Sequence, residues 1–312
     1  MGVRTDLALE AQEMYSQNTA KADKIDGVDV KVTKNEGITT TKIKITNKNG
    51  ERALQKPIGT YVTIEAPDIK YSVEAYESAC ILLSEEIKSI THIDSKTKTL
   101  VVGLGNKRIT PDALGPDVIS KLMVTNHMKE HMKEYFDDDI TSVCAIAPGV
   151  LGTTGMETAQ IIKGVINQIH PDLVICVDAL ASRSLDRIST TIQLADTGIN
   201  PGAGVDNSRA RLDEESLGVK VIAIGVPTVV DAATIASDAI DTAFNDVEQQ
   251  TPSDEKKNNL IKEALSKNIK TLMVTPKDID TVIEKASKTV ANGINMALHK
   301  NLTFEDIESF VG

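Results

Sequence analysis

Two acidic residues stand at positions where an α/β protein usually carries its chemistry. Asp178 ends the apolar run 173–178, and Asp112 follows the apolar run 100–104 after a polar loop. Ligands and reacting groups gather at the carboxyl ends of parallel strands, so we expect both carboxylates at one mouth of a sheet. Unlike surroundings can separate the pKa values of two carboxyl groups into an acid and a base. The pair therefore predicts a cleft for general acid–base chemistry.

Each acid also has a purely structural interpretation. Thr110-Pro111-Asp112 is typical of a helix start, because threonine caps, proline fits the first helical position and an acid suits the positive end of the macrodipole. An acid at a strand end, such as Asp178, can cap the next turn. Spacing alone leaves both interpretations open.

A second motif suggests a metal. The segment His127-Met-Lys-Glu-His131 matches the zinc-peptidase pattern H-x-x-E-H. The same segment is typical of a solvent-facing helix of mixed charge, and no distant acidic ligand is placed by the spacing. We therefore predict no metal ligands and no cofactor, while a divalent metal and the role of the two histidines stay open.

Other catalytic patterns are missing or incomplete. Gly103-Leu-Gly105 fails as a dinucleotide fingerprint because Arg108 occupies the third glycine position, and no phosphate-binding loop or G-x-S-x-G elbow occurs. The cysteines lie in apolar segments and make poor nucleophiles; they are Cys80, Cys144 and Cys176. Their odd number and wide spacing indicate thiols in a reducing compartment.

The elements that must position Asp112 and Asp178 follow from hydrophobic periodicity. Apolar runs alternate with helical segments, which predicts an α/β fold with a mostly parallel sheet and helices on both faces. We expect strands at residues 100–104, 142–147, 173–178 and 219–226, and helices at residues 71–90, 112–135, 155–169, 231–247 and 277–299. Residues 190–194 alternate as an edge or antiparallel strand would, and residues 250–259 have the composition of a linker.

Near the N-terminus the apolar residues recur with a different period, that of β-strands. Residues 28–46 alternate apolar and polar side chains around Asn35-Glu-Gly37, which predicts a hairpin, and residues 61–65 could add a third strand. We therefore predict a small antiparallel β layer within residues 1–70, followed by an α/β core with C-terminal helices over residues 71–312.

Net charge and hydropathy disfavour two classes of binding partner, nucleic acids and membranes. The net charge of −11 disfavours direct nucleic-acid binding, because phosphate contacts need clustered lysine and arginine. Residues 1–30 do not resemble a signal peptide, and no apolar run approaches the roughly 20 residues that span a bilayer. We expect a cytoplasmic protein without a membrane partner.

Several long motifs resemble one family. They are V-V-G-L-G-N (101–106), T-P-D-A-L-G-P (110–116), P-G-V-L-G-T-T-G-M-E-T (148–158), V-D-A-L-A-S-R-S (177–184), D-T-G-I-N-P-G-A-G-V (196–205), I-A-I-G-V-P-T-V-V-D-A (222–232) and L-M-V-T-P-K (272–277). In this order they resemble the germination proteases of spore-forming bacteria. The resemblance implies a tetrameric endopeptidase of the spore core that degrades small acid-soluble spore proteins and is made as a zymogen.

The resemblance also assigns residues. V-R-T-D-L-A-L-E-A (3–11) resembles the family's processing site, which implies self-cleavage between Asp6 and Leu7 after a short propeptide. Asp112 and Asp178 match the pair proposed as catalytic. We further predict substrate contacts from Gly105, Asn106 and Arg183, with turn formation or an ion pair as the alternatives.

The family is similar in fold to the hydrogenase maturation endopeptidases, which hold a metal. Asn106, Asp112 and Asp178 match that layout, but no residue matches the histidine that completes the metal site. Two alternatives therefore stand beside the carboxylate protease. One is a metal-dependent, maturation-type endopeptidase, and the other is a non-enzymatic binding protein for small spore proteins.

Overall fold

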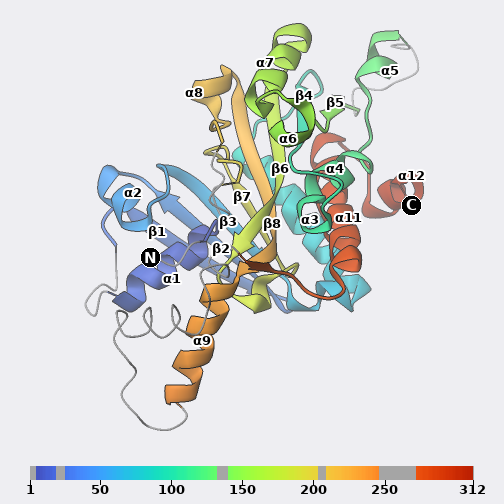
Figure 1. Cartoon of the computed structure of the whole chain (residues 1–312). Helices are drawn as coiled ribbons and strands as arrows, with labels where there is room; N and C mark the ends of the chain where they lie inside the picture. Colours follow the sequence, from blue (N-terminus) through green and yellow to red (C-terminus); the bar gives the residue numbers. More distant parts are fainter. Residues whose placement is uncertain (1–4, 19–24, 132–139, 203–208, 246–271, 312) are drawn as a thin grey trace.

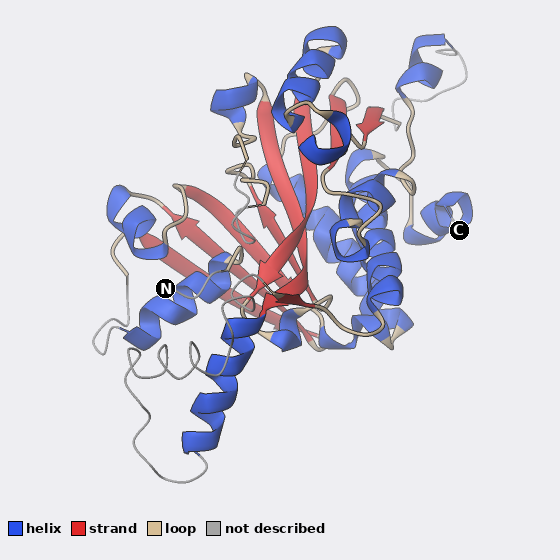
Figure 2. Cartoon of the chain, viewed as in Figure 1, coloured by secondary structure: helices blue, strands red, loops and turns tan. Residues whose placement is uncertain are grey.

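A single mixed sheet organises the molecule, and the computed structural model describes residues 5–18, 25–131, 140–202, 209–245 and 272–311 of it (Figures 1 and 2). Nine strands of this described part follow the order β1-β2-β3-β7-β8-β6-β4-β5, with β9 paired to β8. Their bounds are β1 Val28–Asn35, β2 Ile38–Ile45, β3 Gly59–Glu65, β4 Lys98–Gly103, β5 Ser142–Ile146, β6 Leu173–Ser182, β7 Thr191–Ala195, β8 Lys220–Asp231 and β9 Met273–Val274.

The sheet has a parallel half and an antiparallel half. Strands β8, β6, β4 and β5 run parallel, as the alternation of strands and helices predicts. The N-terminal strands are the antiparallel continuation of this sheet, because β3 pairs with β7 from Tyr61 opposite Ala195 to Glu65 opposite Thr191. Strand β7 is antiparallel as expected, but it lies inside the sheet between β3 and β8. The α/β class is confirmed, and the division at residue 70 stays a prediction.

Helices cover both faces of the parallel half because its strands are apolar on both sides. Along β4, Leu100 and Val102 pack into one buried cluster, whereas Val101 packs into the cluster of the opposite face. The first cluster includes residues of α7 (Thr158–Ile169) and α8 (Glu214–Leu217), and the second lies under α3, α4 and α11 (Figure 1). These three are Val73–Ile90, Leu114–Ile119 and Ile279–Leu298.

The region predicted as one helix over residues 112–135 is broken. The 3-10 turn η2 (Thr110–Asp112) leads into α4, and α5 (Asn126–His131) begins only after an irregular stretch. In that stretch Met123 N–H donates to Asn295 Oδ1 on α11, and Thr125 N–H donates to the Val143 carbonyl on β5. These long-range hydrogen bonds replace the helical ones, so tertiary contacts interrupt the periodic pattern.

The N-terminal helix α1 (Ala8–Asn18) is docked on the antiparallel half. Ala8 and Leu9 pack with Ile43, Ile45 and other buried residues of β2 and β3. The remaining helices are α2 Lys48–Leu54, η1 Pro67–Lys70, α6 Leu151–Thr154, η4 Leu185–Arg187, α9 Ala232–Asn245 and α12 Phe304–Val311. The predicted linker 250–259 lies outside the described residues. Within the described part, the helices are too short or too polar to cross a membrane.

Candidate active site

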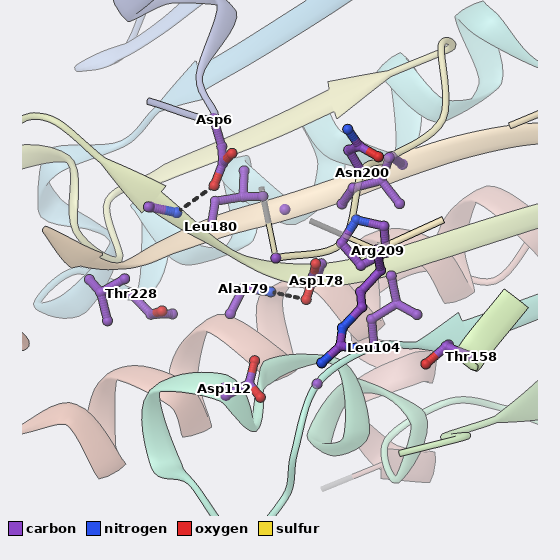
Figure 3. A pocket seen from close by; sticks show the side chains of 18 of the residues that line it. Asp6, Leu104, Asp112, Thr158, Asp178, Ala179, Leu180, Asn200, Arg209 and Thr228 are labelled. Carbon is purple, nitrogen blue, oxygen red and sulfur yellow. Dashed lines mark hydrogen bonds between the residues drawn. The ribbon is translucent and has the colours of Figure 1, made fainter. Parts of the chain in front are cut away.

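A cavity of about 760 Å³ opens where the parallel strands end, and both Asp112 and Asp178 line it (Figure 3). Strand β4 ends at Gly103, which pairs with Val177, whereas β6 continues to Ser182. Leu104 N–H makes a last bond of 2.7 Å to the Val177 carbonyl. Asp178 is the next residue of β6, so its side chain lies at the point where the neighbouring strand leaves the sheet.

Asp178 is the more deeply buried acid of the pair. Asp178 is only 7% exposed, and its Oδ1 accepts the N–H of Ala179 at 3.0 Å. Burial raises the pKa of Asp178 well above its usual range, and the nearby carboxyl groups of Asp112 and Asp6 raise it further. Burial therefore favours the protonated, uncharged form of Asp178, which can give a proton.

Asp112 ends the turn η2 and is half-buried. Burial raises the pKa of Asp112 to about 6, although the N–H of Asn106 donates to its Oδ2 at 2.8 Å and opposes this shift. Thr228 Oγ1 donates to the carbonyl of Pro111 and ties the turn to β8. Near pH 7 Asp112 is mostly ionised, whereas burial favours the protonated form of Asp178, so the pair can offer one base and one acid.

The Gly105-Asn106 turn brings the backbone against Asp112. Gly105 has φ +108°, and a Cβ there would lie 2.1 Å from the Asp112 carbonyl oxygen, so only glycine fits. Asn106 N–H bonds both to that carbonyl, at 3.0 Å, and to the Asp112 side chain, while its Oδ1 accepts the N–H of Arg108. Both residues line the cavity. The turn interpretation holds for them, and their predicted contact with substrate stays a prediction.

The N-terminal segment enters the same cavity. Asp6 lines it, and Figure 3 shows Asp178 between Asp6 and Asp112, with the three side chains carried by separate segments. Burial raises the pKa of the Asp6 carboxyl, while Lys56 opposes the shift. The next residue, Leu7, is fully buried. Asp6, on the N-terminal side of the predicted processing bond, thus lines the same cavity as the two acids.

Two residues that line the cavity belong to no motif of the sequence. Lys56 Nζ donates to the Asp6 carbonyl oxygen at 2.9 Å, and Gln193 Nε2 donates to the same oxygen at 3.1 Å. Gln193 lies on β7 on the face opposite Ile192 and Leu194, yet it is buried. The alternating pattern assigns such a polar position to solvent, so it gave no signal for Gln193. Lys56, in the loop after α2, carries no signal either.

Arg183 lies outside the candidate site. It is not among the described residues that line the cavity, and its backbone N–H donates to Glu10 Oε2 at 2.8 Å. Glu10 is 1% exposed and also accepts from Ser182 Oγ and Arg187. The end of β6 therefore anchors α1, and the predicted substrate contact of Arg183 stays a prediction.

The histidine motif lies away from the cavity. His127 and His131 are exposed on α5. In the described part of the chain, no group of three or more histidine, cysteine, aspartate or glutamate side chains is arranged to hold a metal ion.

Comparisons with known proteins agree on one family. The family model described as germination protease matches residues 8–252 and 247–311. The germination protease of Clostridium tetani is 48% identical over 100% of both chains, and that of Caldanaerobacter subterraneus subsp. tengcongensis is 46% identical over 100% of this chain and 98% of its own. The germination protease of Bacillus pumilus is 38% identical over 99% of this chain and 96% of its own. The chain therefore belongs to the germination protease family and is an endopeptidase of spore germination.

Proposed function

We propose that this endopeptidase degrades small acid-soluble spore proteins during germination and is made as a zymogen that cuts its own Asp6–Leu7 bond. The observation that carries the proposal is the presence of Asp112, Asp178 and Asp6 in one cavity, with Leu7 buried next to it. A bond held there by the fold is an intramolecular substrate, so proximity alone favours its cleavage over that of a free peptide.

Asp112 and Asp178 are the proposed catalytic pair. Ionised Asp112 takes a proton from water as the water oxygen attacks the scissile carbonyl carbon, and protonated Asp178 gives its proton to the leaving amine. Two carboxyl groups this close titrate as a coupled pair, because ionising one disfavours ionising the other. Gly105, Asn106 and Arg183 are proposed substrate contacts of lower rank.

The test uses Asp112→Asn and Asp178→Asn in the full chain, with Asp29→Asn on the exposed face of β1 as a matched control. Mass spectrometry follows the Asp6–Leu7 bond, and gel electrophoresis follows a purified small acid-soluble spore protein. We expect each active-site variant to lose at least about 10³-fold in both rates, as removing a catalytic acid or base does. Circular dichroism checks that each variant is folded. Unchanged rates in either variant would remove that acid from the mechanism.

The same assay separates the metal-dependent alternative. We propose that no cofactor is needed, so a chelator should leave the rates unchanged. Loss of activity with a chelator, and its return with one divalent ion, would favour the maturation-type endopeptidase.

The assembly and location follow from the family resemblance. We expect a homotetramer in the cytoplasm of the spore core, without nucleic-acid or membrane partners. Analytical ultracentrifugation at micromolar concentration tests the tetramer, and fractionation of spores tests the location.

A further inference from the structure

We propose that Lys56 and Gln193 form the site that holds and polarises the carbonyl oxygen of the peptide bond being cut. The inference rests on the proposed self-processing between Asp6 and Leu7 and adds two residues to it. In this assignment Asp112 and Asp178 exchange protons with the water and the leaving amine. Lys56 and Gln193 stabilise the negative charge that develops on the carbonyl oxygen.

The geometry at the Asp6 carbonyl is that of two converging side-chain donors. Lys56 Nζ lies 2.9 Å and Gln193 Nε2 lies 3.1 Å from this oxygen. The donors come from separate elements, the loop after α2 and the strand β7. Both residues line the cavity that holds Asp112 and Asp178. Preorganised donors aimed at one carbonyl oxygen beside an acid–base pair are the usual means of stabilising an oxyanion.

Gln193 makes hydrogen bonds to the backbone on both sides of Leu7. Its Oε1 accepts the N–H of Ala8 at 2.6 Å, while its Nε2 donates to the Asp6 carbonyl. Only this orientation of the amide satisfies both backbone groups, since one of them is a donor and the other an acceptor. Because Gln193 itself is buried in the sheet, it holds the peptide unit between the two bonds in one orientation.

Lys56 brings positive charge to the same oxygen. Burial lowers the pKa of Lys56, while the charges of the Asp6 and Glu10 carboxyl groups oppose this shift and favour the ammonium form. Lys56 Nζ also donates to the Thr5 carbonyl at 3.3 Å. A cation removed from bulk water stabilises a neighbouring oxyanion more strongly than a hydrated one does.

The water oxygen bonds to the Asp6 carbonyl carbon, its proton passes to Asp112, and the π electrons move onto the oxygen between Lys56 and Gln193. When the carbonyl re-forms, the carbon–nitrogen bond breaks and the nitrogen of Leu7 takes the proton of Asp178. The products are the α-carboxyl group of Asp6 and the amine of Leu7, and the proton on Asp112 restores Asp178.

The experiment measures the first-order rate of Asp6–Leu7 cleavage in the full chain by mass spectrometry. Lys56→Met and Gln193→Met remove one donor each, and Lys48→Met and Gln12→Met are matched controls on exposed helix surfaces. We expect each donor variant to slow cleavage about 10²- to 10³-fold, as loss of one oxyanion donor does. Lys56→Arg, which keeps a cationic donor, should recover part of the rate. Donor variants within threefold of the wild type would overturn the inference.

A second readout separates catalysis from simple anchoring of the segment. In the Asp178→Asn background, where the bond stays intact, hydrogen exchange reports on the Asp6 N–H that donates to the Ala181 carbonyl. Because both variants also remove hydrogen bonds to the segment, we expect some loss of protection, but one at least about tenfold smaller than the loss of rate. Loss of protection that matches the loss of rate would assign both side chains to anchoring and overturn the inference. A wild-type chain that never cuts itself would instead refute the proposed self-processing.

Discussion

Asp6 and Ala181 are joined by a pair of hydrogen bonds, although they lie 175 residues apart in the chain. Asp6 N–H donates to the Ala181 carbonyl at 3.1 Å, and Ala181 N–H donates to Asp6 Oδ2 at 2.9 Å. The register of β6 against β8 shifts between Leu180 and Ala181. Irregularities of this kind turn backbone groups out of the ladder. The backbone of Ala181 is thus turned to the N-terminal segment, which it seats beside Asp178.

Removing the Asp6 side chain should slow self-processing. Asp6→Ala deletes the acceptor of the Ala181 N–H, a bond worth about 1–2 kcal/mol, which corresponds to roughly tenfold in rate. Asp6→Asn keeps an acceptor oxygen and should lose less. Mass spectrometry of the intact chain over time gives both rates, and Asp26→Ala on an exposed loop serves as control. Equal rates for Asp6→Ala and the wild type would show that this bond does not position the segment.

Glu10 should be a major contributor to the stability of the docked N-terminal helix. Its buried carboxylate accepts the N–H groups of Arg183 and Ser184 and the side chains of Ser182 and Arg187. Glu10→Ala leaves these donors buried without their acceptor, so we expect a loss of about 3 kcal/mol in the free energy of unfolding.

Urea denaturation measures the effect of Glu10→Ala. Glu13→Ala is the control, because Glu13 also pairs with Arg187 but has a side chain that is 41% exposed. That variant should lose at most about 1 kcal/mol. Equal losses in the two variants would contradict the buried role of Glu10.

Cleavage of a substrate protein by the processed enzyme should fall at acid pH. Burial raises the pKa of Asp112 to about 6, so its base form is present above that pH and disappears below it. We expect the rate to drop about tenfold for each pH unit below 6. A pH–rate profile of kcat/KM tests this, with circular dichroism at each pH to exclude unfolding. A rate that stays flat down to pH 4.5 would exclude Asp112 as the base.

His299 should make the fold sensitive to acid. Burial lowers the pKa of His299 to about 4, with the carbonyl of Met123 opposing and Lys129 adding to the shift. The unfolded chain therefore binds the proton first, and the free energy of unfolding should decrease by up to about 3 kcal/mol as the pH falls from about 6.5 to 4.

The His299 effect is measured by urea titration at several pH values. His299→Gln should remove this part of the pH dependence, while His92→Gln at an exposed site should keep it. The same acid sensitivity in His299→Gln would assign it to other groups.

The amino-acid sequence alone determined most of the local structure. Apolar runs specify the strands around Asp178, and alternation specifies the hairpin of β1 and β2, because both patterns are set by residues close together in the chain. The same pattern placed Asp112 after a strand end, but it ended the strand of Asp178 too early: β6 runs on to Ser182, and it is the neighbouring β4 that ends beside Asp178. The break between α4 and α5 was missed, since the groups that compete for its backbone, such as Asn295, come from distant parts of the chain.

Only the tertiary structure decided how the site is completed. Strand β7 carries Gln193 into the middle of the sheet because β3 and β8 pair on either side of it, and strand order is set by long-range pairing that periodicity does not encode. The same pairing brings Lys56 and the Asp6 carbonyl together beside Asp178. Contacts among such distant residues depend on register and packing, so the two donors at the scissile carbonyl emerged only once the chain was folded.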